Sequence, residues 1–408
     1  MTKLLVRKSL LSFVVAACCS VTLLSATAEK TPAQKAAAEK KRQYTNSWQI
    51  AFGGSDKDIA YCVAPAEKGS VIVAGATRTF GKGRDDVLVI KVDRNGKILW
   101  KKTFGRKRKD IAYAITPTHD GNFVIVGETR SFSELGDPDL YAIKIDTRGN
   151  LIWERHVGGK MRDFGKAVVA TGDGGVLIAG ASESFGDNYL DAYIVKLDKN
   201  GKEEWAKIVG GERDDIANGI ALTTDGGFVI AGVTESYGYQ SKDYYIVRFD
   251  KHARQRWTKL FGEDSEDIAK AVVATDDGGC VVTGNTRSYG SKRNDIMVVK
   301  VAANGKLVWQ RLFGYKEKEW MNAIAKKRDG GFMMAGLTDS FGHGKFDFYV
   351  MQLDPQGHSV WAPVYGGEYD DKAYGITRTS EGNFVVVGST KSYGKGKEDY
   401  FVVQLRKR

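Results

Sequence analysis

A short alternation of hydrophobic and polar positions recurs along most of the chain. In one copy it reads DIAYAITP (110–117), FVIVGETR (123–130), DLYAIKI (139–145) and LIWERHVGG (151–159). β-Branched and aromatic residues dominate these runs, and the turn-forming segments THDGN and DTRGN separate them. Alternation of period two, interrupted by such turns, predicts four short β-strands in each copy. No segment beyond residue 43 has a helical period.

Four columns of residues fix the register of the repeat. Tryptophan recurs at intervals of 52 or 53 residues, at Trp48, Trp100, Trp153, Trp205, Trp257, Trp309 and Trp361. The second column is acidic and consists of Asp58, Asp110, Asp163, Asp215, Asp267, Glu319 and Asp371. The third column consists of the glycines Gly69, Gly121, Gly174, Gly226, Gly278, Gly330 and Gly382. The fourth column is again acidic and consists of Asp86, Asp139, Asp191, Asp243, Asp295, Asp347 and Asp399. Seven copies of a unit of about fifty residues predict an all-β, seven-bladed β-propeller with four-stranded blades.

The two ends of the repeated region are complementary. The strand around Trp48 lacks its three preceding strands, and the last copy, ending in YFVVQL, lacks its tryptophan strand. We therefore expect SWQIAF (47–52) to complete the seventh blade, so that the N-terminal strand pairs with the C-terminal blade. This closure would hide the sheet edges that an open array exposes.

Each column has a physical reason in such a fold. The first strand of a copy carries small residues, as at Ala60/Cys62 and Ala112/Ala114, which suit strands crowded around an axis. The tryptophan of the last strand is expected to bury a large area between neighbouring blades. The acidic columns stand where loops enter strands, so their carboxylates are expected to accept backbone N–H bonds and hold those loops. Calcium binding at these positions is the alternative, although no D-x-D-x-D-G loop supports it.

The first 43 residues differ from the rest of the chain. Lys3, Arg7 and Lys8 precede an uncharged apolar run over residues 9–25. An A-x-A cleavage pattern follows, so residues 1–28 are predicted to be a secretory signal peptide. Residues 29–43, rich in alanine and lysine, are expected to form a flexible linker before the propeller at residues 44–408.

This organisation predicts an exported protein, located in the periplasm or outside the cell, without a stable transmembrane segment. Two alternatives remain: a membrane anchor, for which the apolar run is short, and lipidation at Cys18 in the lipobox-like VAAC. Beyond the signal peptide the cysteines are Cys62 and Cys280, too few for a disulfide framework. They fall in blades that are not neighbours, so no bridge between them is expected.

The copies resemble a repeat of exported, mostly uncharacterised bacterial and archaeal proteins. Its consensus, YGG…D-x-A…DGGF-x-x-x-G-x-T-x-S-[FY]-G…D-x-x-x-x-K-[LV]-D-x-x-G-x-x-x-W, is matched by VGGERDDIANGIALTTDGGFVIAGVTESYGYQSKDYYIVRFD (209–250) and its counterparts over residues 44–408. The resemblance implies a propeller of the quinoprotein-like class and no particular activity.

Quinone-dependent dehydrogenases are similar in one local feature, the D-x-x-G-K-x-x-W turn at residues 93–100 and 198–205. Those enzymes usually also have eight blades, a vicinal disulfide over the cofactor and a calcium site of Glu, Asn and Asp. Here the adjacent cysteines are Cys18 and Cys19, inside the predicted signal peptide, and the repeat count is seven. Quinone chemistry is therefore disfavoured, and no cofactor is expected.

Residues that break the repeat are better functional candidates than residues that all copies share. Loops from last to first strand, and from second to third strand, lie on one face of a propeller. That face is predicted to carry the basic residues Lys82, Arg84, Arg106, Lys107, Arg108, Lys109, Lys395 and Lys397 of blades seven, one and two. The opposite sector carries the acidic residues Glu212, Asp214, Glu263, Asp264 and Glu266. The basic side could recognise an anionic polymer or an acidic protein surface, or the charges could serve solubility alone.

Trp320 is a second position that breaks the repeat, because isoleucine or phenylalanine occupies it in blades one to five. It is either a core substitution or an exposed aromatic that stacks on a sugar at the mouth of the central channel.

These features favour an exported, monomeric binding or scaffold module of the cell envelope, with a protein or polysaccharide partner. The formal net charge is +11, but export argues against nucleic acid as the partner. A polysaccharide-acting enzyme with its site in the central depression is the alternative, because glycosidase carboxylate pairs leave no linear motif. The sequence contains no G-x-S-x-G, H-E-x-x-H or phosphate-loop motif and no histidine pair with metal-ligand spacing.

Overall fold

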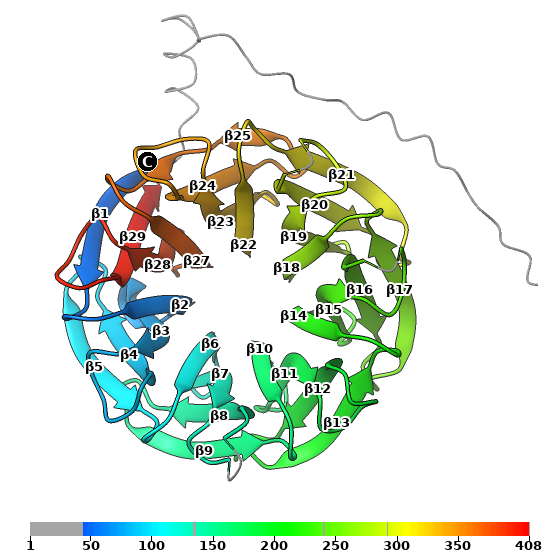
Figure 1. Ribbon diagram of the computed structural model, residues 1–408, viewed down its shortest axis with the longest axis horizontal. Helices are drawn as coiled ribbons and strands as arrows, with labels where there is room; N and C mark the ends of the chain where they lie inside the picture. Colours follow the sequence, from blue (N-terminus) through cyan, green and yellow to red (C-terminus); the bar gives the residue numbers. More distant parts are fainter. Residues whose placement is uncertain (1–43, 134–135, 240, 292, 408) are drawn as a thin grey trace, which may run out of the picture.

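Seven β-sheets stand around a common axis as the blades of a propeller (Figure 1). The structure, a computed structural model, describes residues 44–133, 136–239, 241–291 and 293–407. Its elements are strands apart from one 3-10 turn, η1 (Glu67–Gly69), which confirms the predicted all-β, seven-bladed fold. The predicted signal peptide and linker lie outside the described residues. The described part of the chain holds no helix with the length and apolar character needed to cross a bilayer.

The first five blades each follow the chain order from the innermost strand outward. Blade one holds β2 (Asp58–Pro65), β3 (Val71–Thr77), β4 (Asp86–Val92) and β5 (Ile98–Phe104); blade two holds β6 (Asp110–Pro117), β7 (Phe123–Thr129), β8 (Asp139–Ile145) and β9 (Leu151–Val157). Blade three holds β10 (Asp163–Ala170), β11 (Val176–Ser182), β12 (Asp191–Leu197) and β13 (Glu203–Val209); blade four holds β14 (Asp215–Leu222), β15 (Phe228–Thr234), β16 (Asp243–Phe249) and β17 (Gln255–Phe261). Blade five holds β18 (Asp267–Ala274), β19 (Cys280–Thr286), β20 (Asp295–Val301) and β21 (Leu307–Phe313).

Blade six has an interrupted outer strand. Its strands are β22 (Glu319–Lys326), β23 (Phe332–Thr338) and β24 (Asp347–Leu353), followed by the short pieces β25 (Ser359–Trp361) and β26 (Val364–Tyr365). Pro363 stands between the two pieces, and a proline has no N–H to donate to the ladder. The break therefore follows from the sequence at this one blade.

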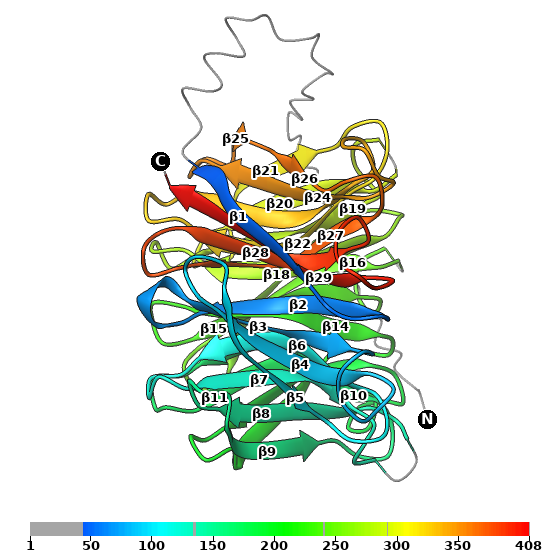
Figure 2. The same ribbon diagram turned by 90° about the vertical axis from the view of Figure 1, so that its left-hand side faces the viewer.

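The seventh blade closes the ring. It consists of β27 (Asp371–Arg378), β28 (Phe384–Thr390), β29 (Asp399–Lys407) and the N-terminal strand β1 (Tyr44–Phe52). β1 pairs with β29 in antiparallel register, with Trp48 opposite Gln404, and Figure 2 shows β1 as the outermost strand beside β29. The closure predicted from the incomplete first and last copies is confirmed.

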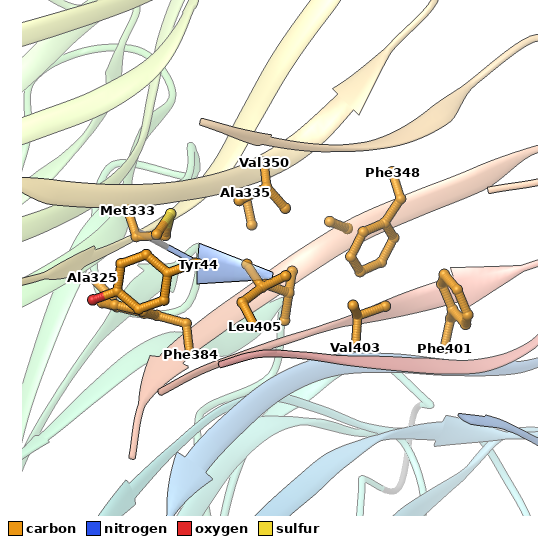
Figure 3. Close-up of a cluster of buried hydrophobic side chains, with 12 residues drawn as sticks. Tyr44, Ala325, Met333, Ala335, Phe348, Val350, Phe384, Phe401, Val403 and Leu405 are labelled. Carbon is orange, nitrogen blue, oxygen red and sulfur yellow. The ribbon is translucent and has the colours of Figure 1, made fainter. Parts of the chain in front are cut away.

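The hydrophobic core consists of seven clusters, and each cluster lies between two neighbouring blades. Figure 3 shows the cluster between blades six and seven, where Met333 and Phe348 face Phe384 and Phe401. Tyr44 of β1 joins this cluster, with its ring centroid 5.3 Å from that of Phe384. No blade buries both of its faces without its neighbours, so the closed ring is the smallest unit with a complete core.

The repeated tryptophans pack between blades as predicted, because each one belongs to or contacts a different cluster between two neighbouring blades. Among the seven, only Trp153 is buried, at 8% exposure, and the others are half-buried on the outer strands. The indole N–H of Trp48 donates to the carbonyl of Arg94 at 2.9 Å, in the β4–β5 turn of the next blade. Gly96 in that turn has φ +87°, and a Cβ there would lie 3.0 Å from the indole. The tryptophan thus holds the outer turn of the following blade.

Two glycines of blade two offer a matched test of this contact. Both have φ +78°, but a Cβ on Gly149 would lie 2.9 Å from both Lys102 Cγ and the indole of Trp100, whereas one on Gly121 would meet nothing within 4 Å. We expect Gly121→Ala to cost about 1 kcal/mol from backbone strain alone. Gly149→Ala should cost about 1–2 kcal/mol more, because the methyl group displaces the indole.

Thermal or denaturant unfolding of the two variants measures the difference. Equal destabilisation by Gly149→Ala and Gly121→Ala would mean that the indole contact adds nothing to the stability of the ring.

Candidate ligand-binding face

The long loops gather on one side of the ring, which we call the loop face. It comprises the loops that enter the innermost strands and those that join the second and third strands of each blade. The buried carboxylate of Asp58 accepts hydrogen bonds from the Gly54 N–H at 2.9 Å and the Thr79 hydroxyl at 2.8 Å. Asp86 accepts the N–H groups of Lys82 and Gly83 at 2.9 and 2.6 Å. The acidic columns therefore anchor loops, as predicted.

The two acidic columns also meet each other between blades. A Cβ on Gly262 would lie 2.2 Å from Asp243 Oδ1 and 2.7 Å from Asp267 Oδ2, so only a glycine fits between the two carboxylates. Burial, together with the charge of Asp267, raises the pKa of Asp243 to about 6. Burial and the adjacent acid likewise raise the pKa of Asp139 and that of Asp347. Within the described residues, no group of three or more acidic, histidine or cysteine side chains is placed to hold a metal ion.

The structure brings most of the predicted basic residues together on the loop face. A Cβ on Gly83 would lie 2.4 Å from the carbonyl of Arg106 and 2.5 Å from that of Arg108, so the loop of Lys82 and Arg84 rests on the loop of blade two. We call the predicted set Lys82, Arg84, Arg106, Lys107, Arg108, Lys109, Lys395 and Lys397 the basic sector. All of these residues are exposed except Lys109, which is half-buried.

Some cations of the basic sector already have partners. Lys109 pairs with Glu128 at 2.7 Å, and Lys397 pairs with Asp56 at 3.3 Å. The guanidinium carbon of Arg106 lies 4.3 Å from the ring centroid of Phe132. Among the described residues, no carboxylate forms an ion pair with Lys82 or Lys107. The exposed, uncompensated charge of this sector is therefore smaller than the sequence alone suggests.

The opposite sector is acidic in sequence but partly neutralised in the structure. Glu212, Glu263 and Asp264 are exposed. Glu266 pairs with Arg287 at 2.7 Å and with Lys242 at 3.5 Å.

A ring of residues around the axis was not identified from the sequence. In every innermost strand the pairing register shifts around one residue, a β-bulge that frees its side chain from the regular alternation. The bulged residues, in blade order, are Tyr61, Tyr113, Lys166, Asn218, Lys270, Asn322 and Tyr374. The sequence does contain a signal for these residues, because their position varies among the copies while small residues flank it in most of them.

The ring residues contact one another around the axis. The ring centroid of Tyr61 lies 5.6 Å from that of Tyr113 and 5.3 Å from that of Tyr374. The ammonium of Lys166 lies 3.5 Å from the centroid of Tyr113. Burial lowers the pKa of Lys166 to about 8, although the nearby Glu128 opposes the shift. The axis is thus lined by tyrosines on one side and by lysines and asparagines on the other.

Trp320 lies apart from the basic sector and lines a cavity of about 340 Å³ at the axis. The cavity is bounded by blades five, six and seven, through Glu266, Ile268, Lys270, Asn285, Arg287, Asn294, Trp320, Asn322, Leu337, Phe346, Lys372 and Tyr374. The half-buried indole meets the ring of Phe346 edge-on at 5.5 Å. The blade-seven counterpart of Trp320 is Lys372, which the sequence comparison also overlooked.

A second cavity of about 480 Å³ lies away from the axis, beside the outer strands of blades two and three. Its lining includes Phe185 and Tyr193, which occupy aromatic columns of the repeat, and Gly158 of the repeated loop. The cavity at the axis is lined instead by positions at which the copies differ, so it is the better candidate for a specific ligand.

Comparisons with known proteins support the fold and leave the family open. No family model matches the chain. The regulatory protein FlaEY of Caulobacter vibrioides is 25% identical over 184 residues, covering 39% of this chain and 18% of that protein, so the chain spans under a fifth of that relative.

Solved structures show the same kind of fold at low sequence identity. Chaetomium thermophilum Sqt1, bound to the N-terminus of the ribosomal protein L10, has a TM-score of 0.51 at 11% identity, covering 89% of this chain and all of that one. A puromycin hydrolase S511A mutant complexed with PGG has a TM-score of 0.51 at 15% identity, covering 86% of this chain and 54% of that one. At these identities the likeness concerns the β-propeller fold alone.

The paired carboxylates predict a pH dependence of stability. A raised pKa means that folded Asp243 binds its proton more tightly than the unfolded chain, so its contribution to stability falls as the pH rises from about 4 to about 6. We expect Asp243→Asn to reduce the loss of stability between about pH 4 and pH 7 by about 1–2 kcal/mol. The asparagine carbonyl can still accept the Tyr239 N–H, which bonds Asp243 at 3.0 Å.

Unfolding curves across this pH range check the prediction, with Asp264→Asn on an exposed loop as the control. A pH slope identical to that of the unaltered chain would show that the Asp243–Asp267 pair does not couple protonation to folding.

Proposed function

We propose that this chain is an exported binding module that docks an acidic protein surface on the basic sector of its loop face. One observation carries the proposal: cations that depart from the repeat in three consecutive blades lie together on exposed loops. These loops are held by buried carboxylates, so their side chains are presented on a fixed frame. A preorganised, charged surface gives specificity and faster association with a partner of opposite charge.

Export rests on the first 28 residues, whose basic start, apolar run and A-x-A site have the order of a signal peptide. An envelope location follows from it as part of the proposal. The crystal structure of Sqt1 with the N-terminus of a ribosomal protein supports the idea that this fold serves protein binding.

The positions of the carboxylates give less support to an enzyme that acts on polysaccharides. Such an enzyme needs two accessible carboxyl groups on either side of the scissile bond. Asp243, whose pKa is raised, and the neighbouring Asp267 are at most 1% exposed and lie between blades. They are occupied in holding loops, which favours binding over hydrolysis.

The test is a pull-down from envelope extract with the unaltered chain and with an Arg106→Ser, Lys107→Ser, Arg108→Ser variant. Lys109 is kept because it neutralises the largely buried Glu128. The matched control removes the same charge on the opposite face, by changing the exposed turn lysines Lys199, Lys251 and Lys306 to serine. We expect the loop-face variant to bind at least about tenfold more weakly, and increasing salt to weaken the unaltered complex.

Protease treatment of the extract should abolish capture if the partner is a protein. Equal capture by the loop-face variant and the control, or capture that survives protease and identifies a polysaccharide, would overturn the proposal.

A further inference from the structure

We propose that the cavity at the axis between blades five, six and seven is a binding site for an acidic sugar, that is, a sugar ring bearing a carboxylate. The inference goes beyond the docking of a protein on the basic sector and does not depend on it. It rests on the aromatic, amide and cationic side chains that line one cavity of about 340 Å³.

The aromatic wall of the cavity is formed by Trp320 and Phe346. Trp320 stands at the start of β22, where blades one to five have isoleucine or phenylalanine, so the fold itself does not require an indole. Its edge-on contact with Phe346 at 5.5 Å holds the indole in place. Among the described residues, no acceptor bonds the indole N–H of Trp320, unlike that of Trp48. The indole therefore offers both an apolar surface for a sugar ring and a donor for a hydroxyl.

Three asparagines supply polar groups around this wall. Asn285 accepts the Met321 N–H at 3.1 Å, and Asn294 accepts the Arg287 side-chain N–H at 3.2 Å. Asn322 donates to the carbonyl of Ala373 at 2.8 Å. Each amide is thus fixed by one bond, and its other end has no protein partner in the described part of the chain. Fixed amides with one end open can bond sugar hydroxyls, since they both donate and accept.

The charge of the lining is positive. Lys270, Lys372 and Arg287 line the cavity together with a single carboxylate, Glu266. Glu266 is already paired with Arg287 at 2.7 Å and with Lys242 at 3.5 Å. Among the described residues, no carboxylate forms an ion pair with Lys270.

Lys270 is the cation of the cavity whose charged form an anionic ligand would stabilise most. Burial, with the charge of Lys242, lowers the pKa of Lys270, so its ammonium is less stable here than in water. A bound carboxylate would supply an ion-pair partner for this ammonium.

Size and chemistry together indicate the ligand class. The volume lies at the lower end of the range for small-molecule sites, about 300–1,000 Å³, and suits a ligand of about one or two sugar rings. A ring face for the indole, hydroxyls for the amides and a carboxylate for Lys270 are combined in a uronic acid. A neutral sugar would leave Lys270 unpaired, and a simple carboxylate would leave the indole uncovered.

The test compares galacturonic acid with galactose, which differ only by a carboxylate in place of a hydroxymethyl group. Titration calorimetry and tryptophan fluorescence on the full chain measure binding of each. We expect galacturonate to bind at least about tenfold more tightly than galactose and than acetate. Lys270→Gln should remove most of this preference, and Trp320→Ile, which restores the repeat residue, should weaken both sugars.

Lys306→Gln, which loses the same charge at an exposed turn on the opposite face, should bind like the unaltered chain. Circular dichroism confirms that each variant is folded. Galactose or acetate binding as tightly as galacturonate, unchanged affinities in both cavity variants, or no binding of folded protein at about 10 mM galacturonate would each overturn the inference. Because the basic sector is intact in these variants, the outcome is separate from that of the pull-down.

Discussion

The packing of one blade against the next is the constraint from which the rest of the structure follows. Every hydrophobic cluster joins two neighbouring blades, and the second and third strands are buried along almost their whole length. A single blade would leave both faces in water, so each blade depends on its two neighbours for a complete core. The pairing of β1 with β29 supplies the last of these contacts and removes the open ends of the array.

The same constraint explains why so many positions are fixed. Small residues fit where innermost strands crowd the axis, glycines fit between paired carboxylates, and tryptophans hold the outer turns of the next blade. These requirements recur at each junction, so the sequence repeats them. The bulged residues escape these requirements, because their side chains meet around the axis and not inside a junction between blades. The copies are free to differ there, and a site with one specific chemistry can form on a sevenfold frame.

Periodicity was sufficient to predict the number of blades, the closure and the anchoring of loops by the acidic columns. These features depend on spacing and on backbone hydrogen bonds, which a linear pattern records. The packing of the tryptophans between blades was also predicted, whereas the hydrogen bond of Trp48 to the outer turn of the next blade depends on how two blades meet.

The charges of the loop face and the ring around the axis were harder to predict. The pairing of Glu266 with Arg287 depends on how two loops from one blade come together. This arrangement cannot be predicted from either loop sequence alone. The bulged ring could have been found by aligning the copies, since it is the variable position of the innermost strand. Lys372 shows the same signal, because it occupies in blade seven the position that Trp320 has in blade six.

We propose that the residues at which the copies differ around the axis serve binding and are not needed for the fold. The most direct measurement is the thermal unfolding midpoint of a chain carrying Trp320→Ile and Lys372→Ile, which gives blades six and seven the residue found in most other copies. If the claim is correct, the midpoint equals or exceeds that of the unaltered chain, because the junctions between blades are untouched. A fall of more than about 5 °C would contradict it, by showing that these side chains are part of what holds the ring together.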